Sequence, residues 1–151
     1  MSDITTVILA AGNSTRFTAS KSKLVYPLCG LPIVSHIFNI AKKISGKNIL
    51  IVSNEKNKEE LKLILNTSKL VVQKKQKGTA DAIEQVKKYV KSKNILILFG
   101  DTPLVEVKDI FIFIKEVSKK AYRSHLMSLC IVISSINVPN TGRRNQDQYL
   151  T

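Results

Sequence analysis

Short apolar runs alternate with segments of helical period along nearly the whole chain, and this alternation limits the fold more than any other feature of the sequence. The apolar runs predict strands at Ile4 to Leu9, Asn48 to Val52, Leu70 to Val72, Asn94 to Phe99 and Leu126 to Ser134. The segments between them predict helices near Ile33 to Ser45, Lys56 to Asn66, Thr79 to Lys91 and Val107 to Lys120. A β-α-β order of this kind is typical of an α/β fold, in which helices cover both faces of a mostly parallel sheet.

The length and composition indicate one domain. With 151 residues, of which 44% are hydrophobic, the chain is large enough to bury a core of its own. We expect this domain to occupy residues 1–138 and residues 139–151 to form a disordered tail, because the sequence from Asn140 to Gln148 is polar and has no apolar period. No stretch approaches the roughly 20 apolar residues that cross a bilayer, and no signal peptide opens the chain. We therefore expect a soluble, cytoplasmic protein with no membrane partner.

The two cysteines, Cys29 and Cys130, carry no recognisable chemistry. They lie far apart in the sequence, without a CxxC motif or a neighbouring histidine that would suggest a metal site. We interpret both as reduced residues that serve in packing, since a free cysteine behaves as a small hydrophobic side chain.

A formal charge of +13, from 24 basic and 11 acidic residues, indicates an anionic partner such as nucleic acid, a membrane surface or phosphate groups. The lysines are scattered over predicted helix faces, and aromatic residues make up only 6% of the chain. Nucleic-acid binding is the weaker interpretation, because there is neither a basic stripe nor an aromatic stacking surface. Solvated lysine faces explain most of the charge.

The loops that follow three predicted strands are where a ligand is expected, because α/β sheets bind ligands at the carboxyl ends of their strands. The loop after Leu9 is long and starts with small residues that let the backbone approach an anion closely: Ala10, Ala11 and Gly12. Further along this loop, Arg16 and Lys23 would supply positive charge to phosphate groups. The alternative is an ordinary turn glycine followed by surface charges.

The loop after Val72 leads directly into a predicted helix. Gln73 offers an amide donor and a carbonyl acceptor, which together can read the edge of a base such as uracil. Gly78 allows close backbone approach, and Thr79 can cap the helix or contact a ligand. Taken alone, this segment would also fit a polar surface turn with a Thr cap.

The loop after the strand that ends at Phe99 continues with Gly100 and Asp101. A carboxylate at the tip of a buried strand is a suitable ligand for Mg²⁺, which prefers one or two carboxylates together with phosphates and water. Asp101 is therefore the candidate metal ligand, and an Asx-turn before Pro103 is the simpler alternative.

Three motifs occur in order between Leu9 and Leu104: Leu-Ala-Ala-Gly-x-x-x-Arg with a downstream lysine, Gln-x-x-x-x-Gly-Thr-Ala, and Gly-Asp-x-Pro-Leu. The whole match spans roughly Val7 to Gly142. Together they resemble the sugar-1-phosphate nucleotidyltransferase superfamily. Within it they are most similar to the uridylyltransferase domain of the bacterial bifunctional N-acetylglucosamine-1-phosphate uridyltransferase/glucosamine-1-phosphate acetyltransferases.

The resemblance implies a Rossmann-like sheet and a Mg²⁺-dependent reaction of UTP with N-acetylglucosamine 1-phosphate, which gives UDP-N-acetylglucosamine, a peptidoglycan precursor, and pyrophosphate. It implies a catalytic role in holding phosphates for Arg16 and Lys23, and metal binding for Asp101. The residues that it implies around the nucleotide are Leu9, Ala10, Ala11, Gly12, Lys23, Gln73, Gly78, Thr79, Phe99, Gly100 and Asp101.

The sequence departs from this family at several positions. Ser22 stands where a proline usually precedes the loop lysine, and Asp81 stands where a histidine usually follows Gly-Thr-Ala. The resemblance ends after Thr141-Gly142, before the residues that hold the sugar and a second metal ligand. We therefore expect a truncated domain with weak or no uridylyltransferase activity alone and no acetyltransferase activity. A separately encoded remainder of the domain is a possible partner.

Two other functions stay open. One is a nucleotide-binding or partner-dependent fragment without catalysis. The other is a different nucleotidyltransferase that uses a cytidylyl or guanylyl group.

Overall fold

The computed structural model describes residues 4–12, 21–67, 69–75, 78–119, 124–127 and 130–134. Its strands are β1 (Ile4–Leu9), β2 (Pro27–Leu28), β3 (Leu31–Pro32), β4 (Ile49–Ser53), β5 (Leu70–Val72), β6 (Asn94–Phe99), β7 (Ser124–Met127) and β8 (Cys130–Ser134). Its helices are η1 (Lys23–Val25), a single 3₁₀ turn, and α1 (Ile33–Ser45), α2 (Lys58–Leu65), α3 (Thr79–Lys87) and α4 (Val107–Lys119). The predicted tail over residues 139–151 lies outside the described residues.

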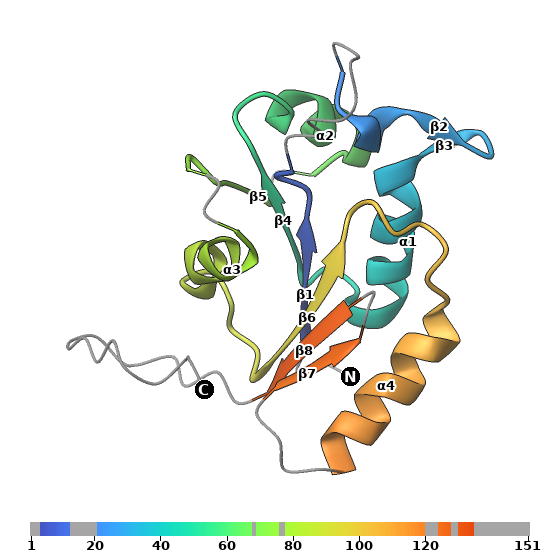
Figure 1. Cartoon of the computed structure of the whole chain (residues 1–151), viewed down its shortest axis with the longest axis vertical. Helices are drawn as coiled ribbons and strands as arrows, with labels where there is room; N and C mark the ends of the chain where they lie inside the picture. Colours follow the sequence, from blue (N-terminus) through green and yellow to red (C-terminus); the bar gives the residue numbers. More distant parts are fainter. Residues whose placement is uncertain are drawn as a thin grey trace.

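The main sheet has six strands in the order β5-β4-β1-β6-β8-β7, and its first four strands are parallel (Figure 1). From β1 the chain moves outward to β4 and β5, and then returns past β1 to β6. This reversal places a topological switch point between β1 and β6, where α/β sheets bind ligands beyond the carboxyl ends of their strands. The predicted α/β fold with a mostly parallel sheet is confirmed.

Alternate residues of the central strands bury against opposite layers of helices. Ile8, Leu96 and Leu98 belong to one core cluster, which includes buried residues of α1, α2 and α4. Val7, Ile95 and Ile97 belong to a second cluster, which includes Ala82 and Val86 of α3. Successive strand residues point to opposite faces, so both faces of β1 and β6 are buried and most of their residues are apolar. Thr5 and Thr6 of β1 are buried polar exceptions. Figure 1 shows α1 and α4 on one side of the sheet and α3 on the other.

The predicted final strand, Leu126 to Ser134, is wrong as a single strand. The structure has a hairpin there, in which β7 and β8 pair antiparallel and β8 also pairs antiparallel with β6. After α4 the chain runs to the edge of the sheet as β7 and returns as β8 between β7 and β6. A single strand was predicted because apolar residues dominate the sequence from Leu126 to Ile133, and both strands of the hairpin draw on that stretch.

A second, smaller hairpin, formed by β2 and β3, lies within the long first loop and was not predicted. Its turn residues, Cys29 and Gly30, have φ angles of 49° and 82°. Positive φ at both central residues is the mark of a type I′ turn, the type that matches strand twist in two-residue hairpins. Cys29 is an exposed free cysteine there, so the interpretation of this residue as a packing residue was wrong.

None of the helices in the described part of the chain has the length and apolar character needed to span a bilayer.

Candidate functional site

A pocket of about 360 Å³ lies where the three predicted loops meet at the carboxyl end of the sheet. Its walls come from the ends of β1 and β6, from η1, from Gln73 and Gly78 between β5 and α3, and from the start of α3. The lining residues are Leu9, Ala11, Gly12, Lys23, Leu24, Gln73, Gly78, Thr79, Ala82, Phe99 and Asp101. Because these elements flank the switch point between β1 and β6, the pocket is the candidate ligand site of the fold.

Two buried asparagines hold the start of the first loop in place. Nδ2 of Asn57 donates to the carbonyl oxygen of Ala10 at 2.7 Å, and Nδ2 of Asn54 donates to that of Ala11 at 3.0 Å. The side chains also brace each other, because Oδ1 of each accepts from the backbone N–H of the other, at 2.9 and 3.0 Å. The amides thus donate to two backbone carbonyl groups at the start of the loop, and they fix the backbone beside the pocket.

The third loop is tied to the first by the backbone. The N–H of Gly100 donates to the carbonyl oxygen of Leu9 at 2.9 Å, and the Thr102 hydroxyl donates to the carbonyl oxygen of Phe99 at 2.8 Å. The first bond continues the pairing of β1 with β6 past the end of the sheet, and the second holds the turn that follows β6. Because Gly100 precedes Asp101 and Thr102 follows it, the two bonds fix the backbone that carries the Asp101 carboxylate at the pocket.

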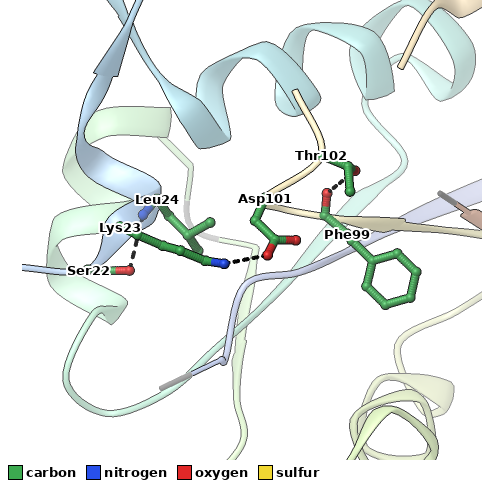
Figure 2. Close-up of polar contacts among 6 residues, drawn as sticks. All are labelled: Ser22, Lys23, Leu24, Phe99, Asp101 and Thr102. Carbon is green, nitrogen blue, oxygen red and sulfur yellow. Dashed lines mark hydrogen bonds and ion pairs between the residues drawn. The ribbon is translucent and has the colours of Figure 1, made fainter. Parts of the chain in front are cut away.

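An ion pair joins the first and third loops across the pocket. Nζ of Lys23 lies 2.5 Å from Oδ2 of Asp101, and their side chains are 41% and 43% exposed (Figure 2). Lys23 opens η1, where the hydroxyl oxygen of Ser22 accepts from the N–H of Leu24 at 3.4 Å and the Leu24 side chain is buried. The buried leucine anchors the short helix, so the lysine ammonium and the carboxylate meet at a defined place open to solvent.

Gln73, Gly78 and the first turn of α3 form the remaining wall. Gly78 has a φ of 99° and a ψ of −176°, a conformation that is essentially restricted to glycine. Gln73 is 4% exposed, and its Nε2 donates to the carbonyl oxygen of Gly78 at 3.3 Å and to Oδ2 of Asp81 at 2.6 Å. One side chain therefore links the end of β5 to the first turn of α3.

The structure places most of the predicted nucleotide-binding residues in the lining of this pocket, with two exceptions. Ala10 is 1% exposed and belongs to the hydrophobic core, and Gly100 is buried behind Leu9 and Leu24. Both lie directly behind the pocket wall rather than in it. Arg16 lies outside the described residues.

Sequence reasoning missed four residues of the site: Leu24 and Ala82 in the lining, and Asn54 and Asn57 behind the first loop. A signal for the asparagines was present, because Asn-x-x-Asn directly follows β4, the neighbour of β1. Leu24 and Ala82 carry no such signal, since small and apolar side chains are expected everywhere in a core.

Among the described residues that line the pocket, a single carboxylate is available for a metal. No cluster of three or more His, Cys, Asp or Glu side chains occurs among the described residues, and of the residues that line the pocket Asp101 alone is acidic. This donor set fits Mg²⁺ held largely by phosphate and water oxygens, and it does not fit a closed all-protein metal cage.

Curated relatives match most of this chain but only a small part of their own length. The chain is 43% identical over 110 residues to the bifunctional protein GlmU of Buchnera aphidicola subsp. Schizaphis graminum, which covers 72% of the chain and 24% of that protein. It is 39% identical over 115 residues to the bifunctional protein GlmU of Campylobacter fetus subsp. fetus, covering 73% of the chain and 26% of the relative. The chain therefore spans about a quarter of the length of these relatives.

Solved structures share the fold at low sequence identity. A putative glucose-1-phosphate thymidylyltransferase from Bacillus anthracis matches with a TM-score of 0.70 and 20% identity, over 80% of this chain and 52% of that one. A CMP:2-keto-3-deoxy-manno-octonic acid synthetase, solved in complex with CTP, matches with a TM-score of 0.68 and 18% identity, over 82% of this chain and 51% of that one. Residues 6–125 match the MobA-like NTP transferase domain family, and the chain belongs to that family.

Proposed function

We propose that the pocket binds the Mg²⁺ complex of UTP and that the chain forms the nucleotide side of a uridylyltransferase acting on N-acetylglucosamine 1-phosphate. The observation that carries this proposal is the Lys23–Asp101 pair, which sets a cation and a carboxylate side by side in a pocket at the switch point. The likeness of the three loop motifs to uridylyltransferase domains supports the choice of uridine, and N-acetylglucosamine 1-phosphate follows from that family resemblance alone. The family and the fold support nucleotidyl transfer in general.

The reaction needs few protein groups. An oxygen of the sugar phosphate attacks the α-phosphorus of UTP in line, a new P–O bond forms, and the bond to the β-phosphate breaks so that pyrophosphate leaves. Positioning and the compensation of negative charge supply most of the catalysis in such transfers. Lys23 would hold the phosphates, and the backbone of Ala11 and Gly12 allows their close approach. When bound, Mg²⁺ supplies further positive charge at the phosphate oxygens, and Asp101 is the residue that would hold it.

The ion pair has to be exchanged for ligand contacts when the nucleotide binds. Both partners are about two-fifths exposed, so the pair contributes only about 0–1 kcal/mol to stability. A charge-assisted hydrogen bond from Lys23 to a phosphate contributes roughly 1.5–3 kcal/mol. A triphosphate can therefore displace the Asp101 carboxylate from Lys23 at little cost, which leaves that carboxylate available to the metal.

The test is calorimetric binding of UTP to the folded chain in Mg²⁺ and in EDTA, with Lys23→Ala and Asp101→Asn variants. Lys23→Ala should weaken UTP binding about 10- to 100-fold, because it removes a charged phosphate contact. Asp101→Asn should remove most of the Mg²⁺ dependence while leaving the affinity in EDTA unchanged or higher. Lys21→Ala is the matched control, because Lys21 is exposed and does not line the pocket.

The proposal would be contradicted if the folded wild-type chain bound no UTP. It would also be contradicted if the Lys23→Ala variant bound UTP as tightly as the wild-type chain does. Transfer itself is followed as pyrophosphate release in the presence of N-acetylglucosamine 1-phosphate. We propose that the rate of transfer is low in the chain alone. Among the described residues only one carboxylate, that of Asp101, lines the pocket, whereas the family resemblance implies a second metal ligand.

A further inference from the structure

The carboxamide of Gln73 is held in one orientation. Its nitrogen, Nε2, donates one hydrogen to Oδ2 of Asp81 at 2.6 Å and can donate the other to the carbonyl oxygen of Gly78 at 3.3 Å. The side chain is almost fully buried, so water cannot replace these partners freely. An ionised carboxylate only accepts hydrogen bonds, and so does a backbone carbonyl. If the amide rotated by 180°, its oxygen Oε1 would face two other acceptors, the Asp81 carboxylate and the Gly78 carbonyl oxygen.

The carbonyl oxygen of this amide is the group that remains for a ligand. Gln73 lines the pocket, and none of the hydrogen bonds among the described residues uses its Oε1. The amide, which in principle offers the pocket either a donor or an acceptor, therefore offers it an acceptor.

We propose that Asp81 is a positioning residue that selects the base: by fixing Gln73 as an acceptor, it makes the pocket favour a pyrimidine that carries a hydrogen on N3. This inference rests on the proposed nucleotide binding and adds the reason for its base preference. At ring position 3, uracil and thymine present an N–H donor, whereas cytosine presents a bare acceptor nitrogen. Two acceptors that face each other in a buried site leave both unpaired, and such losses produce strong discrimination between ligands.

The place of Asp81 in α3 suits this role. It lies in the first turn of the helix, two residues after Thr79, where the helix dipole favours a negative charge. Its Oδ2 also accepts from Nε2 of Gln85, one helical turn further along, at 2.9 Å. Two amides thus hold the carboxylate, and the carboxylate in turn holds Gln73. Glu84 of the same helix instead pairs with Lys87 at 3.8 Å and has an exposed side chain.

The test measures the ratio of the dissociation constants for CTP and UTP, with Mg²⁺, for the full chain and three variants. Asp81→Ala leaves only the long contact with Gly78 to orient the amide. Asp81→Glu keeps an acceptor-only carboxylate and should restore the preference. Glu84→Ala removes one negative charge from the same helix without touching Gln73. UTP and CTP carry the same triphosphate, so neither a change in helix charge nor a loss of folded protein alters their ratio.

The wild-type chain should favour UTP over CTP by about tenfold or more, and Asp81→Ala should lower this preference to about threefold or less. Asp81→Glu should recover most of it, and Glu84→Ala should keep it within about twofold. A wild-type preference for UTP that survives in Asp81→Ala would overturn the inference and leave the proposed UTP site standing. The inference would also be overturned if nucleotide binding depended on Lys23 but the wild-type chain bound CTP as tightly as UTP, or more tightly. Absence of binding to either nucleotide by the folded chain would overturn the proposed function and this inference together.

Discussion

Asn57 shows how much a single buried side chain contributes to the pocket. It is 3% exposed, and its amide reaches back to the carbonyl oxygen of Ala10, which lies 47 positions earlier in the chain. Asn54 does the same for Ala11 from the turn before α2. The backbone at Ala10 and Ala11 is therefore held in place by side chains from a different part of the chain.

Replacing Asn57 with alanine should destabilise the fold and weaken the ligand site together. The carbonyl oxygen of Ala10 would be left buried without a donor, which costs about 1–3 kcal/mol. The free energy of unfolding, measured by urea denaturation, should fall by that amount. The affinity for UTP, corrected for the fraction of the variant that is folded, should fall at least about threefold.

Asn39→Ala is the matched control for this substitution. Asn39 is an exposed residue of α1, so its loss should change the free energy of unfolding by no more than about 0.5 kcal/mol. An Asn57→Ala protein as stable as the Asn39→Ala protein would show that these amide contacts contribute nothing.

At the level of single residues, the sequence predicts most of the pocket residues that lie at or just after the end of a strand. Lys23 is the exception, because it comes from a helical turn in the middle of the first loop and still reaches Asp101. Small residues, an amide and a carboxylate lie at the ends of three strands, and the order of the strands alone predicts that they lie close together. The asparagine braces cannot, since a buried polar contact between distant segments depends on packing that no local pattern records.

At the level of elements, α2 shows most simply how burial decides the role of a residue. Leu61 and Leu63 lie in the same short helix, yet Leu61 is 0% exposed in the core and Leu63 is 84% exposed. The two leucines have the same intrinsic helix propensity, so a difference between their substitutions reports packing alone.

Leu61→Ala should lower the free energy of unfolding by about 2–5 kcal/mol, because it removes buried methyl groups and leaves a cavity. Leu63→Ala should change it by no more than about 0.5 kcal/mol. Urea denaturation of the two variants beside the wild type measures both values. Equal effects of the two substitutions would mean that α2 does not pack on the sheet in solution as it does in the structure.

The elements that sequence patterns predict well are those buried on one or two faces of the central sheet. The predicted bounds of β1, β5, β6 and α1 agree with the structure, because the apolar pattern of each stops close to the ends of the element. The two hairpins were not predicted for two different reasons. The turn of the small one uses Cys29 at positive φ, which few residues other than glycine adopt, and the apolar run of β7 and β8 gives no sign of where it folds back.

At the scale of the whole molecule, the net charge of +13 acts on folding and on ligand binding in opposite directions. Like charges repel one another in the compact state and lower its stability, while the same field attracts an anionic nucleotide. Salt screens both effects, since the screening length falls from about 30 Å at 0.01 M ionic strength to about 8 Å at 0.15 M.

Raising KCl over this range should therefore stabilise the free protein and weaken its binding of UTP. The expected gain in stability is roughly 1 kcal/mol, or about 2–4 °C in Tm for a chain of this size, and the dissociation constant for UTP should rise several-fold. Thermal denaturation and calorimetric titration at matched salt concentrations measure the two changes, with sucrose at equal osmolality as the control for effects other than screening. A Tm that falls with salt would mean that favourable ion pairs outweigh the repulsion. An affinity independent of salt would mean that the field of the scattered lysines does not reach the pocket, and that attraction to phosphate is local to Lys23 and its neighbours in the first loop.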